Sequence, residues 1–358
     1  MESSNQSNTK YLWLDCDPGH DDAIAILMAL YTPNVELMGV STVHGNASSV
    51  NTFTNAIRLL HAYGAGSKVK VHAGAAQPLL RPTRADPEIH GVDGLGGVIG
   101  LPGSDDPAVA SLFDQSKSLR AIQGLEAATR WCAEKNTKLH IIASGPLTNI
   151  ALFSAAHPEL ISHIEQIIFM GGGVGIGNRS AVAEFNILCD PEAAQMVLNL
   201  DVPKVMIPLN VTHTAILTLD LHDKNLVKPD VRATGASSVT SPTPLRLMLS
   251  SLVRFFAETY RTTFGFTEGP PLHDACCLAY LHNPGWFKSK RYHVDIELAG
   301  THSAGETIVD VWEYAATDDS WGRTGKNCVV AGSMDVAAFF GLFFDCVAKC
   351  DQLSPLNT

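Results

Sequence analysis

Four aspartates lie within eight residues near the start of the chain, at Asp15, Asp17, Asp21 and Asp22. A proline and a glycine between them force a tight turn, so the chain gathers the four carboxylates instead of spreading them. Such crowding of negative charge costs free energy unless a cation neutralises it. No Cys or His pair at metal spacing accompanies the cluster, and oxygen ligands favour Ca²⁺ or Mg²⁺ over zinc. The alternative is a solvated helix N-terminus, where acidic side chains suit the helix dipole.

The elements around this cluster alternate between short apolar runs and helical patterns. That alternation predicts an α/β fold in a single domain, with a mainly parallel sheet flanked by helices. The polar segment 1–10 is expected to be a disordered tail, and the domain to span 11–358. The expected strands are 11–14, 36–42, 139–143, 166–170 and 204–209, and the clearest expected helices are 21–31, 51–63 and 334–348.

Polar residues follow several of these strands, as a shared binding site would require. Asn46 comes after the second strand, Ser144 and Asn149 follow the strand 139–143, and the glycine-rich segment 171–178 follows the next one. In open parallel sheets, ligands bind beyond the carboxyl ends of the strands. We therefore expect these residues and the aspartates to form one site. Two further segments, 77–106 and 232–244, are expected to be long loops, the first of them mobile.

The composition limits the classes of partner. Hydrophobic residues make up 46% of the chain, and the net charge is −11 without a basic run, so nucleic acid and anionic membrane surfaces are poor partners. Eight cysteines without a CxxC spacing indicate reduced thiols. No apolar run reaches the roughly 18 residues that span a bilayer. The predicted location is the cytoplasm, with the nucleus left open.

The segment DCDPGHDDA, residues 15–23, closely resembles the signature of the inosine/uridine-type nucleoside hydrolases. Further motifs of that family follow in its order and extend the resemblance from about residue 11 to the C-terminus. It implies a Rossmann-like nucleoside hydrolase fold, one Ca²⁺, a homodimer or homotetramer, and hydrolysis of ribonucleosides to ribose and free base. The motifs are VHGN (43–46), IHG (89–91), ASGPLTN (143–149), MGGG (170–173), AEFN (183–186), DPEAA (190–194) and LHD (272–274).

The resemblance also assigns catalytic and metal-binding roles. It implies that Asp17 accepts a proton from the attacking water and that His273 gives one to the departing base. Asp15 is expected to orient its neighbours. The implied Ca²⁺ ligands are Asp17, Asp22, Asp274 and the backbone carbonyl of Ser144.

The substrate-binding residues follow in the same way. In an extended segment, Glu184 and Asn186 would point to the same side. Phe185 would then point to the other side and pack against neighbouring residues, but it remains a candidate substrate-binding residue. Instead of binding substrate, His90 could be an exposed loop histidine, and Met170 could serve only to pack the end of its strand. The implied ribose-binding residues are Asp21, Asn46, Asn178, Glu184 and Asn186, and the other candidates are His90, Met170, Phe185 and Asp274.

Base preference and activity leave alternatives open. The segment TYRTTFGFTEGPPLHD, residues 259–274, places Tyr260 and 264–266 over the expected base pocket and resembles the uridine-preferring fungal type. A purine-preferring or broad-specificity hydrolase is the first alternative. A haloacid-dehalogenase-type phosphohydrolase also begins with a strand and D-x-D, but Gly19 stands where that class usually has Thr or Val. A nucleoside phosphorylase and a non-catalytic nucleoside- or calcium-binding relative are the remaining alternatives.

Overall fold

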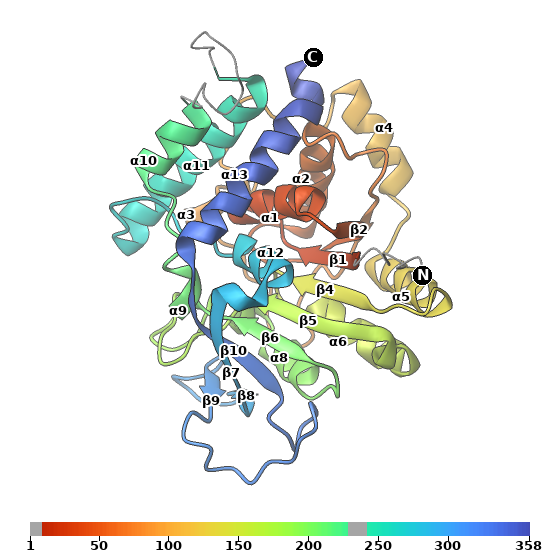
Figure 1. Ribbon diagram of the computed structural model, residues 1–358, viewed down its shortest axis with the longest axis vertical. Helices are drawn as coiled ribbons and strands as arrows, with labels where there is room; N and C mark the ends of the chain where they lie inside the picture. Colours follow the sequence, from red (N-terminus) through yellow and green to blue (C-terminus); the bar gives the residue numbers. More distant parts are fainter. Residues whose placement is uncertain (1–8, 228–241) are drawn as a thin grey trace, which may run out of the picture.

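The computed structural model describes residues 9–227 and 242–358, so most of the expected loop 232–244 lies outside the described residues. Eight strands form one sheet in the order β3-β2-β1-β4-β5-β6-β10-β7 (Figure 1). Every neighbouring pair is parallel except β10 and β7. The predicted α/β fold with a mainly parallel sheet is confirmed. The strands are β1 (Lys10–Cys16), β2 (Val35–Thr42), β3 (Val71–Ala73), β4 (Leu139–Ala143), β5 (Ile164–Met170), β6 (Lys204–Ile207), β7 (Phe287–Tyr292) and β10 (Cys328–Met334).

Helices cover both faces of the sheet (Figure 1). One face carries α1 (His20–Tyr31), α2 (Ser49–Ala62), α11 (Pro244–Phe264), α12 (Ala275–His282) and α13 (Val336–Leu353). The other face carries α5 (Ala121–Glu134), α6 (Thr148–Ala156) and α8 (Pro191–Leu198). The shorter elements are α3 (Pro87–His90), α4 (Pro107–Ser116), η1 (Pro158–His163), α7 (Phe185–Cys189), α9 (Leu209–Thr212), α10 (Leu219–His222), η2 (Asp223–Val227), η4 (Pro284–Trp286), η5 (Pro355–Asn357), and the separate pair β8 (Val294–Ile296) and β9 (Thr307–Val309).

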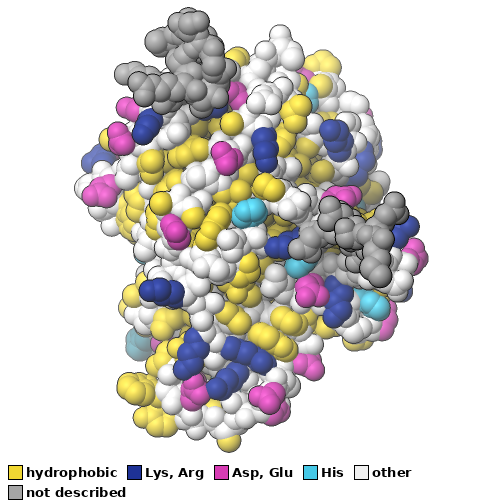
Figure 2. Space-filling model, in the orientation of Figure 1, with side chains coloured by type: hydrophobic (Ala, Val, Ile, Leu, Met, Phe, Trp, Pro, Cys, Tyr) yellow, Lys and Arg dark blue, Asp and Glu magenta, His cyan; other side chains and the backbone are white. Residues whose placement is uncertain are grey.

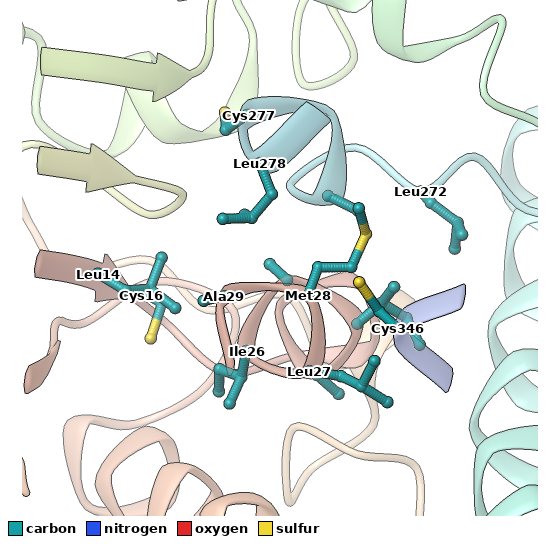
Figure 3. Packing of buried hydrophobic residues seen from close by; sticks show 14 of the residues in the cluster. Leu14, Cys16, Ile26, Leu27, Met28, Ala29, Leu272, Cys277, Leu278 and Cys346 are labelled. Carbon is teal, nitrogen blue, oxygen red and sulfur yellow. The ribbon is translucent and has the colours of Figure 1, made fainter. Parts of the chain in front are cut away.

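Strand β1 shows how the sequence pattern separates two cores. Leu12 and Leu14 pack with the α1 side of the sheet, and Trp13 between them packs with the α5 side. This is the two-residue alternation of a strand buried on both faces. Helix α1 is buried along most of its length, and its residue Met28 lies between Leu278 of α12 and Cys346 of α13 in Figure 3. The buried part of the helix includes its first turn, so the acidic residues Asp21 and Asp22 are internal as well.

The element boundaries differ from the sequence expectations in three informative places. Strand β1 begins at Lys10, inside the expected tail, and continues through Asp15, so this aspartate belongs to the strand and does not follow it. The strand expected to reach Leu209 ends at Ile207, since Pro208 has no backbone N–H for a strand ladder and a helix starts at the next residue. The loop 77–106 contains one helical turn, Pro87–His90.

The charge distribution on the surface and the state of the cysteines are those expected from the composition. On the face drawn in Figure 2, Lys and Arg side chains are scattered among Asp and Glu. Near the β8–β9 pair, for example, Glu313 forms ion pairs with Lys290 at 2.6 Å and Lys326 at 2.7 Å. All eight cysteines are buried free thiols. Within the two described ranges, no helix has the length and apolar character needed to cross a membrane.

Candidate active site

The polar residues meet at the carboxyl ends of the central strands. Strand β1 pairs with β2 on one side and with β4 on the other, so the chain leaves these neighbouring strand ends in opposite directions. Such a switch point is where open α/β sheets bind ligands. A partly open pocket lies there. It is lined by Asp21, Asn46, Asp86, Ile89, His90, Ser144, Met170, Asn178, Arg179, Glu184, Phe185, Asn186, Tyr260, Phe264, His273 and Asp274.

Three carboxylates form a compact group, and two of them, from Asp21 and Asp274, line the pocket. Oxygen atoms of Asp21, Asp22 and Asp274 lie within 4.8 Å of one another, and all three residues are buried. Asp17 is fully buried beside them, where its Oδ2 accepts a hydrogen bond from the Asn46 backbone N–H at 2.8 Å. Its other oxygen, Oδ1, has no hydrogen-bond partner. The compact group thus includes Asp21, which the resemblance gave to ribose, while Asp17 lies outside it.

Asp22 is held by donors from three segments. The Ser144 hydroxyl donates to Asp22 Oδ1 at 2.8 Å, and the backbone N–H of Gly19 and the Asn46 side-chain amide each donate to Asp22 Oδ2 at 3.0 Å. The Ser144 carbonyl, the expected backbone ligand, accepts a hydrogen bond from the Asn186 side chain at 2.8 Å. These contacts fix the carboxylate and the carbonyl at the strand ends.

The donor set fits a hard divalent cation. Burial raises the pKa of Asp17 and Asp274 well above the usual value, and repulsion between the neighbouring carboxylates adds to the shift. Burial also raises the pKa of Asp22, against hydrogen bonds that lower it. A buried group of this kind either takes up protons or binds a cation. The oxygen-only ligands and the unpartnered Oδ1 of Asp17 favour Ca²⁺ or Mg²⁺.

This electrostatic arrangement predicts a distinctive pH dependence of stability. Burial raises the pKa of Asp15 to about 7, against hydrogen bonds from Ser41 and Asn149. A carboxyl whose pKa is higher in the folded than in the unfolded state contributes stability at low pH and loses it as the pH rises through the folded-state pKa. We therefore expect the Tm of EDTA-treated protein to fall between about pH 5 and pH 8 in scanning calorimetry.

Added Ca²⁺ should oppose that fall, because cations bind the deprotonated carboxylates and stabilise the folded state. The comparison is between matched scans in EDTA and in excess Ca²⁺ at each pH. Superimposable curves across the whole pH range would contradict a cation site in this cluster.

Two glycines make room for the Asp17 carboxylate. A Cβ atom on Gly45 would lie 2.0 Å from Asp17 Oδ2, and a Cβ on Gly145 would lie 2.6 Å from Asp17 Oδ1. Gly45 also has a φ of +152°, whereas Gly145 does not have a positive φ. The loops after β2 and β4 therefore approach this side chain as closely as their backbones allow.

Because Gly145 needs no special backbone conformation, Gly145→Ala tests the position of Asp17 with little backbone strain. The added methyl should displace the carboxylate and lower kcat at least tenfold, while the circular dichroism spectrum stays unchanged. Gly341→Ala is the matched control, since a Cβ there meets no atom within 4 Å. Equal activity of the two variants would show that the position of Asp17 does not matter.

The ribose candidates do lie together, but not through the expected local structure. The extended segment predicted for residues 184–186 is wrong, because a short helix, α7, begins at Phe185. Glu184 caps this helix by accepting hydrogen bonds from the backbone N–H groups of Asn186 at 2.8 Å and Ile187 at 3.1 Å. Its Oε2 also accepts from the Gly172 N–H at 3.0 Å. Capping, and not strand alternation, brings Glu184 and Asn186 to the pocket, and Phe185 lines it too.

The other ribose candidates come from the loops after β2 and β5. Asn46 and Asn178 line the pocket, and Asn178 Oδ1 accepts a hydrogen bond from the Phe185 N–H at 2.9 Å. Met170, at the end of β5, is 4% exposed and lines the pocket. Its carbonyl accepts a hydrogen bond from the Asn186 amide at 3.2 Å. The structure thus brings every substrate-binding candidate to one pocket.

His273 is held between two hydroxyl groups. Its Nδ1 lies 2.7 Å from the Thr212 hydroxyl, and its Nε2 lies 2.7 Å from the Tyr260 hydroxyl. Burial lowers its pKa well below the usual value, so the ring is neutral at pH 7. A neutral imidazole has one N–H donor and one acceptor nitrogen, so it donates a hydrogen bond to one of these hydroxyls and accepts one from the other.

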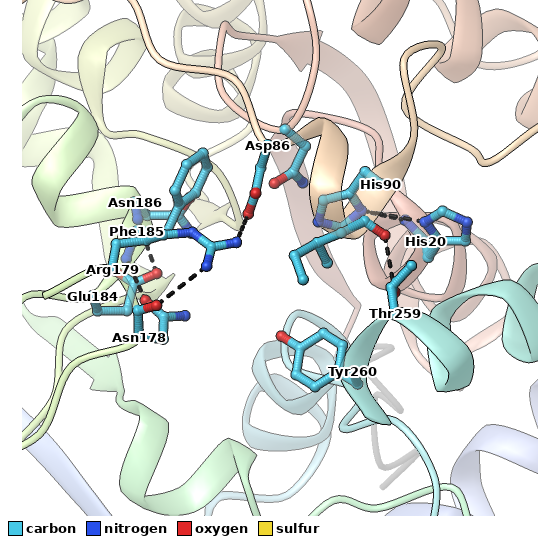
Figure 4. Close-up of polar contacts among 12 residues, drawn as sticks. His20, Asp86, His90, Asn178, Arg179, Glu184, Phe185, Asn186, Thr259 and Tyr260 are labelled. Atoms are coloured by element: carbon cyan, nitrogen blue, oxygen red, sulfur yellow. Dashed lines mark hydrogen bonds and ion pairs between the residues drawn. The ribbon is translucent and has the colours of Figure 1, made fainter. Parts of the chain in front are cut away.

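His90 is buried, contrary to the alternative of a surface loop histidine. Its ring Nδ1 lies 3.2 Å from His20 Nδ1, and the two rings stack with centroids 5.4 Å apart (Figure 4). The loop that carries His90 is pinned to α11, because the Thr259 hydroxyl donates to the Ile89 carbonyl at 3.1 Å. Burial lowers the pKa of His90 well below the usual value. His90 therefore lines the pocket as a neutral ring.

Some lining residues were not anticipated from the sequence. Asp86 and Arg179 form an ion pair across the pocket, and neither belongs to a motif of the family series. Tyr260 and Phe264 line the pocket as predicted, but Phe266 lies outside its lining. The only available signal for Arg179 was its position directly after Asn178.

A doubly wound sheet with a buried polar pocket at its switch point defines an α/β enzyme with a small-molecule site. A family model described as inosine-uridine preferring nucleoside hydrolase matches residues 12–341. The pyrimidine-specific ribonucleoside hydrolase RihA of Shewanella woodyi is 38% identical over 337 residues, which cover 93% of this chain and 96% of that protein. A probable ribonucleoside hydrolase of Dictyostelium discoideum is 32% identical over 349 residues, covering 95% and 94%.

Solved structures of nucleoside hydrolases have the same fold as this chain. The purine-preferring ribonucleoside hydrolase from Gardnerella vaginalis has a TM-score of 0.80 at 28% identity and covers 96% of this chain and 100% of that one. The chain belongs to the inosine-uridine preferring nucleoside hydrolase family and is a ribonucleoside hydrolase, an N-glycosyl hydrolase. Membership of this family confirms the resemblance seen in the sequence. It rules out the haloacid-dehalogenase-type phosphohydrolase and the non-catalytic relative as alternatives.

Proposed function

We propose that this enzyme hydrolyses the N-glycosidic bond of ribonucleosides, with a preference for uridine, in a reaction that needs one Ca²⁺. The observation that carries the proposal is the buried group of Asp21, Asp22 and Asp274, of which Asp21 and Asp274 line a pocket rich in amides and carboxylates. The pyrimidine-specific relatives support the base preference.

The residues suited to hold the cation are those named from the motifs. Asp17, Asp22, Asp274 and the Ser144 carbonyl would supply its oxygen ligands, and the position of Asp21 makes it a further candidate. When bound, the cation supplies positive charge that makes a neighbouring water more acidic.

The chain supplies the base and the sugar contacts. Asp17 accepts the proton of the attacking water, and the unpartnered Oδ1 leaves this carboxylate an oxygen free for that role. Asn46, Asn178, Glu184 and Asn186 offer convergent donors and acceptors to the ribose hydroxyls. The buried carboxylates also stabilise the positive charge that develops on the ribosyl group more than they stabilise neutral substrate.

The departing base receives its proton from the opposite side of the pocket. The C1′–N bond breaks and the electron pair goes to the base nitrogen. His273 acts in its protonated form, the minor form at pH 7, and becomes neutral when it donates its proton to the base, while the Tyr260 hydroxyl beside it holds the ring. His90 lines the same side and contacts the base. Water completes the balance by giving its oxygen to C1′ and one proton to Asp17.

A nucleoside panel tests this proposal. We expect release of ribose and free base, with kcat/KM highest for uridine among uridine, cytidine, inosine and adenosine. Omitting phosphate should change nothing, since a phosphorylase would need it and this enzyme uses water. A strict requirement for phosphate, or ribose 1-phosphate as the product, would refute hydrolysis.

A purine preference is the second candidate, because the purine-preferring enzyme of Gardnerella vaginalis superposes over nearly the whole chain. A higher kcat/KM for inosine than for uridine in the same panel would establish it. We further propose a cytoplasmic homodimer or homotetramer with a role in pyrimidine salvage.

A further inference from the structure

Arg179 is an unusual member of the pocket lining. Among the lining residues in the described part of the chain, it is the only Lys or Arg, and it lies directly after the ribose candidate Asn178. Its guanidinium forms an ion pair with Asp86, from the opposite loop, as Figure 4 shows. The two histidines of the pocket are neutral at pH 7, since burial lowers the pKa of each. Arg179 therefore supplies the permanent positive charge of this lining.

Aromatic rings hold the guanidinium in place. Its central carbon lies 5.8 Å from the centroid of the Phe185 ring and 5.2 Å from that of Phe264. The Phe264 ring contacts Tyr260, whose hydroxyl binds His273 at 2.7 Å. Arg179 thus borders the side of the pocket that carries the groups next to the departing base.

The ion pair is also more exposed to solvent than the carboxylate group, which places it nearer the pocket rim. The side chains of Arg179 and Asp86 are 20% and 11% exposed, whereas Asp22 is fully buried. A base joined to a ribose beside the carboxylate group points its far edge away from the sugar. That edge is the part of the base that reaches the rim.

We propose that Arg179 is a specificity-determining residue, which recognises the carbonyl oxygen at the far edge of a pyrimidine base while Asp86 holds its guanidinium in position. This inference rests on the proposed function and names the chemical group that decides between substrates.

The chemistry of the two pyrimidines explains the choice. Uracil has the O4 acceptor at the edge where cytosine has an N4 amino donor. A guanidinium has five N–H donors and no acceptor, so it can bind O4 but not the amino group. When the glycosidic bond breaks, the electron pair left on uracil N1 spreads onto its carbonyl oxygens. A fixed cationic donor at O4 stabilises that charge in the transition state.

The test compares uridine with cytidine in the Arg179→Met variant. A good specific contact of this kind discriminates between bases by about 10- to 100-fold. We expect kcat/KM for uridine to fall by that factor and kcat/KM for cytidine to change less than about threefold, so that the preference largely disappears. Arg179→Lys, which keeps the charge but not the planar fork, should retain part of the preference.

Arg261→Met is the matched control, because Arg261 is an exposed arginine of α11 that forms an ion pair with Glu258 in the same helix and does not line the pocket. It should leave both rates unchanged. Equal losses for uridine and cytidine in Arg179→Met, with a normal circular dichroism spectrum, would show that Arg179 only joins two loops. A wild-type enzyme without preference for uridine over cytidine would overturn the inference as well. No base release by wild type from any nucleoside would instead refute the proposed function.

Discussion

Asp17→Asn is expected to lower kcat for uridine by about 10²- to 10⁴-fold, the usual range for loss of a general base. The change keeps the shape of a fully buried side chain and removes its negative charge. The asparagine cannot take a proton from water, and it is a weaker ligand for a cation than a carboxylate. Steady-state kinetics with uridine, together with thermal unfolding, measure the two consequences separately.

Asp190→Asn is the matched control for that experiment. Asp190 is also fully buried, but it caps α8 and accepts a hydrogen bond from the Thr148 hydroxyl at 2.7 Å, outside the pocket lining. Its replacement should lower the Tm and leave kcat of the folded enzyme within a fewfold of wild type. If Asp17→Asn kept a near-normal rate, Asp17 would not be the base.

His273→Ala is expected to lower kcat for uridine by about 10²-fold or more, the lower range for loss of a general acid. The effect on a 4-nitrophenyl riboside should be far smaller, because nitrophenolate leaves without a proton. The two hydroxyls that hold the imidazole, from Thr212 and Tyr260, fix its position in the pocket lining. Parallel assays of wild type and variant on uridine and on the nitrophenyl riboside measure the loss of kcat for each substrate, and the ratio of the two losses tests the proton-donor role.

His157→Ala controls for the loss of a histidine, since His157 lies at the end of α6 and not in the pocket lining. Both substrates should react with it at wild-type rates. A loss of equal size on uridine and on the nitrophenyl riboside would remove the proton-donor role from His273 and leave it a structural one.

The sequence predicted the sheet well because its strands are buried on both faces. The strand 139–143 was predicted with its observed bounds, since its residues are apolar except for His140. The aspartates were predicted to gather because Pro18 and Gly19 leave little choice of turn. In both cases the residues that decide the local structure are neighbours in the chain, so they can be recognised from a single short segment of sequence.

The errors occurred where contacts between distant segments decide the structure. The helix after Glu184 is only five residues long, and the Gly172 backbone N–H helps to hold its capping side chain. The two-residue alternation of residues 184–186 therefore gave a wrong prediction of an extended segment. Asp86 and Arg179 are 93 residues apart, and no spacing rule connects them. The grouping of Asp21 with Asp22 and Asp274 likewise depends on how α1 packs beside α12.

Metal content measured together with activity tests the central claim most directly. After dialysis against EDTA, Ca²⁺ is added back in steps, bound Ca²⁺ per chain is counted, and uridine hydrolysis is assayed at each step. We predict that hydrolysis rises in proportion to occupancy and reaches its maximum at one Ca²⁺ per chain, with no such binding by Asp274→Asn. Full activity in protein shown to contain no divalent metal would contradict the account.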